Sequence, residues 1–144
     1  MSEGKHYSLI KPSLRTPFHI DFNWWQQHDG NWRVYLQSYL CEECSESLKN
    51  FGEETLIDIV DPSTGEVQRV DGLLHALMTH CANQPGFITD QTTLVDAVFR
   101  YFLANGNTPL TPLELADAIG KPASTILKTF SGSKVFKGIR PVGL

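Results

Sequence analysis

The chain has 144 residues, of which 41% are hydrophobic and 19% are charged, and its formal net charge is −4. This composition is typical of a globular protein and excludes an intrinsically disordered chain. No apolar run is long enough to cross a bilayer, and the first residues lack the apolar core of a secretion signal, so we expect a cytoplasmic protein without a membrane partner. Three cysteines form an odd number, which fits a reducing compartment better than a disulfide framework.

The first predicted elements are a short strand and an aromatic helix. Apolar and polar residues alternate from Phe18 to Phe22, which indicates a strand or an extended lead-in. A helix is expected from Trp24 to Leu40, with its Trp and Tyr side chains near one side. The Asp29-Gly30-Asn31 stretch is a weak point that predicts a kink or a break. Another helical turn is expected from Ser45 to Phe51.

A β-hairpin and a further helix follow. Strands are predicted over Leu56–Val60 and Glu66–Val70, on either side of Asp61-Pro62-Ser63-Thr64-Gly65. That loop has a proline for the first turn position and a glycine for a positive φ, which is typical of a hairpin. The next helix is expected over Gly72–Asn83, with an apolar face and a stop at the Gln84-Pro85-Gly86 stretch.

The second half of the chain predicts three helices and then a basic extended segment. Thr92 or Thr93 caps the first helix, which continues to about Ala104. Pro112 suits the first position of the second helix, because proline lacks an N–H that would be unpaired there. Gly120 ends this helix in the left-handed region, and Pro122 begins the third, which runs to Phe130. The extended segment covers residues 134–142.

The helix pair around Gly120 resembles the helix-turn-helix of DNA-binding proteins. Counted from Pro112, the small residue Ala116 is fifth, Gly120 is ninth and the β-branched Ile126 is fifteenth. In this motif the small residue lets the helices cross closely, the glycine turns the chain, and the β-branched residue fills the angle between the helices. With its flanking elements the likeness covers about residues 92–142 and resembles a winged helix. One clear strand follows the motif, so a strand from elsewhere in the chain is a candidate partner.

The distribution of charge is consistent with a nucleic-acid contact near the C-terminus. From Ala118 onward there are five basic and no acidic residues, whereas residues 1–117 contain seven basic and sixteen acidic residues. A solvated basic tail is the alternative. The resemblance makes Ser124, Thr125 and Lys128, on the outer face of the second motif helix, candidates for base contacts in a major groove. The candidates for phosphate contacts are Lys121, Lys134, Lys137 and Arg140.

Two pairs of soft ligands flank the hairpin and predict a metal site. Cys41 and Cys44 have the two-residue spacing that lets both thiolates reach one ion, and His80 and Cys81 follow the hairpin. Neighbouring residues on a helix diverge by about 100°, so both can bind only if the helix frays there. His75 is the substitute fourth ligand.

The ligand set favours tetrahedral zinc over the two other outcomes, an iron–sulfur cluster and a site without metal in which Cys81 is an ordinary buried cysteine. A thioredoxin-like redox pair is disfavoured, because Glu42 and Glu43 are expected to raise the pKa of the thiols.

The expected fold is mostly α (α+β). Residues 1–88 would hold the aromatic helix, the Cys-x-x-Cys pair and the hairpin, and residues 89–144 the helix-turn-helix or winged-helix-like region. No P-loop or other catalytic motif is present in the sequence, so we do not expect an enzyme. The leading hypothesis is a transcriptional regulator that binds double-stranded DNA. The alternatives are an adaptor subunit that binds a protein partner or a second copy of the chain, and a metal- or redox-responsive regulator.

Overall fold

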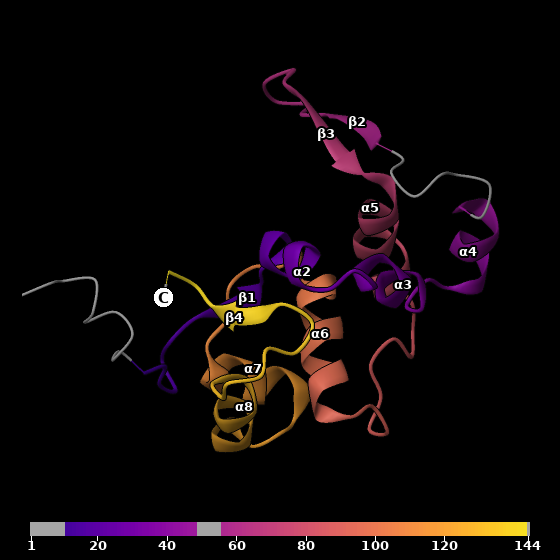
Figure 1. Cartoon of the computed structure of the whole chain (residues 1–144). Coiled ribbons are helices and arrows are strands. Elements are labelled where there is room, and N and C mark those ends of the chain that lie inside the picture. The colour runs from indigo at the N-terminus through magenta and orange to yellow at the C-terminus, as the bar shows by residue number, and fades with distance from the viewer. Residues whose placement is uncertain (1–10, 49–55, 144) are drawn as a thin grey trace, which may run out of the picture. The chain divides into compact units, whose positions relative to one another are not determined.

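The computed structural model describes residues 11–48 and 56–143, and these are mostly helical with two small antiparallel sheets (Figure 1). They divide into two compact units. The terminal unit combines Met1–His28 with Ile88–Leu144, and the inserted unit is Asp29–Phe87. None of the described helices is both long and apolar enough to cross a membrane.

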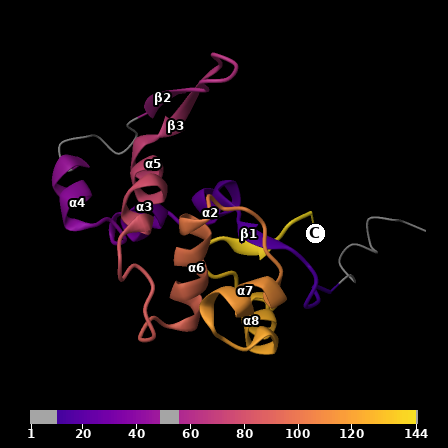
Figure 2. The ribbon, with the colours of Figure 1, turned by 180° about the vertical axis from the view of Figure 1, so that it is seen from behind.

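Three successive helices form the body of the terminal unit, and all three were predicted. They are α6 (Leu94–Ala104), α7 (Pro112–Ile119) and α8 (Ala123–Phe130) (Figure 2). Their inner faces supply its core, because α6 buries a run of large apolar side chains, α7 packs against α6, and α8 packs against α7. The large buried side chains include those of Val98, Phe99, Phe102, Leu103, Leu115, Ile126 and Phe130.

Local signals fix the ends of α7. The Thr111 hydroxyl accepts the Glu114 N–H at 3.2 Å, and a Glu114 carboxylate oxygen accepts the Thr111 N–H at 2.9 Å. This reciprocal pair satisfies donors that the first turn of a helix leaves unpaired. At the other end Gly120 has a φ of 71°, which is the left-handed conformation that its sequence position predicts. Pro122 caps α8 instead of occupying its first helical position.

The sheet of the terminal unit joins the two ends of the chain. Strand β1 (Phe18–Ile20) pairs antiparallel with β4 (Ile139–Pro141), and Phe18 also forms a bridge with Leu110 on its other side. The short strand and its pairing with a distant segment agree with expectation. The sequence predicted a single domain boundary, after residue 88, whereas the described chain changes unit twice, after His28 and after Phe87. Residues 11–28, however, group with the C-terminal region, because β1 lies between Leu110 and β4.

The predicted aromatic helix is two helices. The chain breaks at Asp29-Gly30-Asn31, between α2 (Phe22–His28) and α3 (Trp32–Gln37). Trp25 on α2 is buried and its ring meets the ring of Phe99 edge-on, with centroids 5.5 Å apart. The break separates the units, because α2 belongs to the terminal unit and α3 to the inserted one.

The inserted unit places a hairpin between helices. Strands β2 (Leu56–Val60) and β3 (Val67–Asp71) pair antiparallel, as predicted. Asp71 then caps the next helix by accepting the Leu73 N–H at 2.9 Å, and it forms an ion pair with Arg33 of α3. The described helices of this unit are α3, α4 (Glu42–Leu48), α5 (Gly72–Thr79) and the short 3-10 helix η1 (Cys81–Asn83).

Two helix boundaries in the inserted unit differ from expectation. Helix α4 begins at Glu42 and not at Ser45, so the Cys-x-x-Cys pair opens a helix instead of following one. The predicted end at Phe51 lies outside the described residues. The helix expected over residues 72–83 ends at Thr79, because His80 leaves helical geometry with φ −122° and ψ −63°.

Candidate metal centre and candidate nucleic-acid surface

The start of α4 brings Cys41 and Cys44 to the same side. Cys41 lies just before the helix, where its carbonyl accepts the Ser45 N–H at 2.9 Å, and Cys44 is the third helical residue. The Cys44 backbone N–H donates to the Cys41 sulfur. This is the bond that a capping serine or threonine makes at the same spacing, so the helix start itself orients the two thiols.

The end of α5 supplies the facing residues. Neighbouring residues within a helix point about 100° apart. Because α5 stops at Thr79, His80 and Cys81 are not held at this angle, so both can face one site. The His80 side chain is 40% exposed, whereas Cys81 is buried at 1%. His80 therefore lies at the solvent side of the cluster, and Cys81 lies beneath it.

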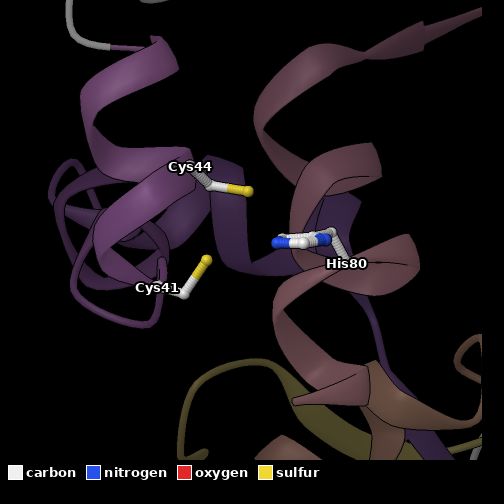
Figure 3. Close-up of side chains that lie close together, drawn as sticks. All are labelled: Cys41, Cys44 and His80. Carbon is white, nitrogen blue, oxygen red and sulfur yellow. The ribbon is translucent and has the colours of Figure 1, made fainter.

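Three of the predicted ligands converge. A sulfur of Cys41, a sulfur of Cys44 and a ring nitrogen of His80 all lie within 4.8 Å of one another, and Figure 3 shows the three side chains pointing toward a common space. In a tetrahedral zinc site with Zn–S bonds of about 2.3 Å, neighbouring ligand atoms are about 3.6–3.8 Å apart. These side chains could therefore hold a metal ion such as zinc with small adjustments.

Cys81 lies beside this group, and His75 does not belong to it. The Cys81 sulfur is 3.4 Å from the Cys41 sulfur and accepts the Cys41 backbone N–H at 3.2 Å. His75 is one helical turn before Thr79 and is not among the three converging residues. Of the two histidines that the sequence offered, the geometry thus favours His80.

The thiols differ in acidity. The hydrogen bond from the Cys44 backbone lowers the pKa of Cys41, with smaller contributions from Cys81 and His80. Burial, followed by the neighbouring thiols, raises the pKa of Cys44 to about 12, and burial also raises the pKa of Cys81. The expectation that Glu42 and Glu43 raise the pKa of both thiols is therefore wrong for Cys41. For Cys44 the cause is burial and not the glutamates.

Glu43 is a member of the cluster that the ligand pattern did not identify. One of its carboxylate oxygens lies 3.5 Å from Nε2 of His80. A carboxylate in this position can orient an imidazole and fix its tautomer. The sequence did contain a signal for Glu43, because this residue lies between Cys41 and Cys44. A helix start that carries both thiols also carries the residue between them to the same site.

The outer face of α8 carries the predicted base-contact residues. Ser124, Thr125 and Lys128 are exposed, while Ile126 and Phe130 on the opposite face are buried. The helical period of the sequence therefore separated the two faces correctly.

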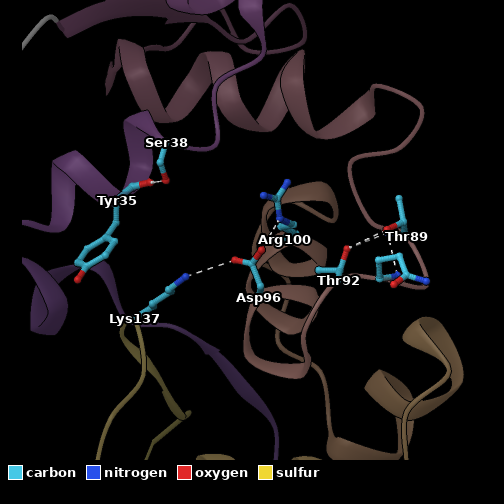
Figure 4. Close-up of polar contacts among 8 residues, drawn as sticks. Tyr35, Ser38, Thr89, Thr92, Asp96, Arg100 and Lys137 are labelled. Carbon is cyan, nitrogen blue, oxygen red and sulfur yellow. Dashed lines mark hydrogen bonds and ion pairs between the residues drawn. The ribbon is translucent and has the colours of Figure 1, made fainter.

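The predicted phosphate contacts fall into two groups. Lys137 forms an ion pair with Asp96 at 3.3 Å (Figure 4), and Arg140 forms one with Asp21 at 3.1 Å. Each cation also lies over an aromatic ring, the Lys137 ammonium 5.6 Å from the Phe99 centroid and the Arg140 guanidinium 5.2 Å from that of Trp24. Both cations are thus engaged in contacts within the terminal unit.

The other two predicted phosphate contacts lie closer to solvent. Lys134 is exposed, with its ammonium 5.1 Å from the centroid of the Phe136 ring, and Lys121 is half-buried beside the turn between α7 and α8. They remain as candidate phosphate contacts.

The two units carry opposite net charges. The terminal unit has nine basic and six acidic residues, a net charge of +3, whereas the inserted unit has three basic and ten acidic residues, a net charge of −7. Because α8 belongs to the positive unit, the net charge of −4 does not oppose a contact between this helix and a polyanion.

Comparison of the chain with protein-family models, with curated proteins and with solved structures gave no match. The geometry of the cysteine–histidine cluster and of the α7–α8 pair is therefore the basis for a functional assignment.

Proposed function

We propose that this chain binds duplex DNA and that α7 and α8 act as its helix-turn-helix. The observation that carries the proposal is the division of α8 into two faces. Ile126 and Phe130 are buried in the core, and Ser124, Thr125 and Lys128 are exposed on the opposite face of a helix, an element that the major groove of DNA admits. The left-handed Gly120 between the helices supports the same assignment.

The surrounding elements support a winged-helix-like version of this domain. Helix α6 packs against α7, and the strand that follows α8 is β4. The partner of β4 is β1 from the start of the chain, so the sheet does not need a second strand after β4. Lys134 lies in the connection between α8 and β4, where a backbone contact beside the groove would fall.

A binding assay on duplex DNA tests the proposal. Fluorescence anisotropy of the full chain on a random-sequence duplex should show an affinity that falls with salt. Each neutralised phosphate contributes about −0.9 to the slope of log affinity against log salt concentration, so Lys121 and Lys134 together should give about −1.8. Lys134→Ala should reduce the slope by about one unit on every sequence. Undetectable binding at low salt would overturn the proposal in favour of the adaptor role.

Selection of preferred sequences from a random pool tests the base contacts. Ser124→Ala or Thr125→Ala should change the preferred sequence while leaving the salt slope unaltered. Thr129→Ala is the matched control on the same helix, because the Thr129 hydroxyl donates to the Thr125 carbonyl at 2.8 Å and faces the helix backbone. A change of preference in the control as large as in the two variants would contradict the assignment of α8 as the reading helix.

We further propose that the cluster of Cys41, Cys44 and His80 binds one zinc ion and that Cys81 completes the tetrahedron. Three soft thiol ligands and one imidazole support zinc, and the 3.4 Å contact between the sulfurs of Cys41 and Cys81 is close to the edge of a zinc tetrahedron. Elemental analysis of protein purified without an affinity metal should find about one zinc per chain. Less than about 0.2 equivalent of zinc and iron together would exclude the site. Visible absorbance would instead indicate an iron–sulfur cluster.

A further inference from the structure

We propose that Cys41 and Cys81 form a reversible disulfide in the metal-free protein, with a peroxide as the oxidant. Their sulfur atoms are 3.4 Å apart, and a disulfide bond of about 2.0 Å requires them to approach by about 1.4 Å. The proposal requires neither DNA binding nor zinc, because the thiols of the metal-free chain are the reacting groups.

Cys41 and Cys81 differ in accessibility, as a pair of one attacking thiol and one resolving thiol requires. Cys41 is half-buried and precedes α4, so a small oxidant can reach its sulfur, whereas Cys81 is buried beneath it at 1% exposure. The Cys81 sulfur also accepts the Cys41 backbone N–H at 3.2 Å, which holds the second thiol against the first. An accessible thiol with a resolving thiol at contact distance is the arrangement of reversible oxidation sites.

Cys44 is a second candidate for a disulfide with Cys41. The two links close loops of different length, and this difference distinguishes them. A Cys41–Cys44 link closes only the start of α4, whereas a Cys41–Cys81 link joins residues 40 positions apart and spans the hairpin and α5. A cross-link that closes a longer loop removes more conformational entropy from the unfolded chain. In the unfolded chain the short link should dominate, because neighbouring thiols meet more often. Folding should shift the preference toward the long link, because the folded protein already holds the Cys41 and Cys81 sulfurs 3.4 Å apart.

The chemistry balances in two steps. The Cys41 thiolate attacks one peroxide oxygen, so an S–O bond forms, the O–O bond breaks, and the leaving hydroxide takes up a proton to become water. The Cys81 thiol then loses its proton and attacks the sulfenic sulfur of Cys41, which forms the S–S bond and releases a second water. Two thiols are oxidised by two electrons, and one hydrogen peroxide is reduced to two waters.

The disulfide and a bound metal exclude each other. Both Cys41 and Cys81 belong to the proposed ligand set, and a disulfide sulfur is no longer a thiolate ligand. The oxidised form also ties the start of α4 to η1 covalently. Metal and peroxide therefore compete for the same two atoms.

Peptide mapping tests the pairing in the full chain. The protein is stripped with a chelator, treated with a few equivalents of hydrogen peroxide, blocked with an alkylating reagent, and cleaved with trypsin and a glutamate-specific protease. Cleavage after Glu42 or Glu43 places Cys41 and Cys44 on separate peptides, and Arg69 and Arg100 flank the peptide of Cys81. Mass spectrometry should find the Cys41 and Cys81 peptides linked and Cys44 alkylated, and a thiol reductant should reverse the link.

Cysteine variants and a denaturant test whether the link is specific to Cys41 and Cys81 in the folded protein. The linked pair should persist in Cys44→Ser and be lost in Cys41→Ser, and in urea it should give way to a Cys41–Cys44 link. A dominant Cys41–Cys44 or Cys44–Cys81 link in the folded protein, or Cys81 fully alkylated after peroxide, would overturn the proposal. Zinc added before peroxide should suppress the link. If it does not, the zinc proposal fails while the disulfide stands.

Discussion

The carboxamide of Asn107 makes two hydrogen bonds to the backbone of Ile20. The Ile20 N–H donates to Asn107 Oδ1, and Asn107 Nδ2 donates to the Ile20 carbonyl, both at 2.9 Å. Beyond the bridge between Phe18 and Leu110, the Asn107 side chain thus makes the hydrogen bonds to β1 that a neighbouring strand would otherwise make. Asn107 itself has a φ of 60°, a conformation that asparagine tolerates better than most residues.

Replacing this amide by a carboxylate should destabilise the terminal unit. Asn107→Asp removes the donor and places a negative oxygen against the Ile20 carbonyl, which should cost about 1–3 kcal/mol of unfolding free energy. Urea denaturation at pH 7 measures the change. Asn23→Asp, an exposed position on α2, is the control and should stay within about 0.5 kcal/mol. Equal stability of the two variants would mean that the Asn107 bonds contribute nothing.

Gly138 is expected to reject a side chain. Its φ is +76°, and a Cβ there would lie 2.8 Å from the Trp25 Cβ and 3.1 Å from the Asp21 carbonyl oxygen. Gly138→Ala should therefore lose at least about 1–3 kcal/mol, because the backbone strain and the overpacking both oppose it. Gly132→Ala is the matched control, since nothing lies within 4 Å of its Cβ position. Thermal denaturation of both variants checks this, and a melting temperature for Gly138→Ala as high as that of the control contradicts it.

The hairpin turn should show a pH dependence that originates from Asp61. The hydroxyl and the N–H of Ser63 donate to its carboxylate at 2.7 and 2.8 Å, and these bonds lower the pKa of Asp61. The folded turn favours the ionised form, so its stabilisation is present above the ordinary value of 3.8 and is lost as the pH falls through the lower folded pKa.

An NMR titration of the Asp61 carboxyl carbon measures this pKa. Ser63→Ala should raise it toward 3.8, while Ser133→Ala, at an exposed position of the terminal unit, should leave it unchanged. A titration midpoint at or above 3.8 in the unmodified protein would refute the role of the Ser63 hydrogen bonds.

Metal affinity should depend on His80 and not on His75. His80→Gln should weaken zinc binding by at least about tenfold, because even loss of an outer partner of a metal ligand costs about 10–100-fold. His75→Gln lies on the same α5 helix outside the converging group and serves as the matched control. Competition with a coloured zinc chelator gives both affinities. Equal losses in the two variants would remove His80 from the ligand set.

Helices α6, α7 and α8 of the terminal unit were predictable because their signals are local. Thr111 and Glu114 lie three residues apart and cap α7 by themselves, and Gly120 ends it through its own backbone freedom. The apolar spacing of Ile126 and Phe130 likewise fixes which face of α8 is buried.

Contacts between distant residues were not predictable in the same way. Arg140 pairs with Asp21 across 119 positions and Lys137 with Asp96 across 41, so a basic segment that resembles a phosphate contact has partners that no local pattern indicates. The start of α4 was also not predicted, because its cap is of an unusual kind. Cys41 is not among the residues that usually cap helices, yet its sulfur accepts the Cys44 N–H as a capping hydroxyl would.

The pairing of β1 with β4 determines the order in which the protein can fold during synthesis. The terminal unit needs residues 139–141 to complete its sheet, so this sheet cannot form until those residues have left the ribosome. The inserted unit ends at Phe87 and contains all four proposed zinc ligands. The proposed ligand set can therefore be complete before residues 139–141 have left the ribosome.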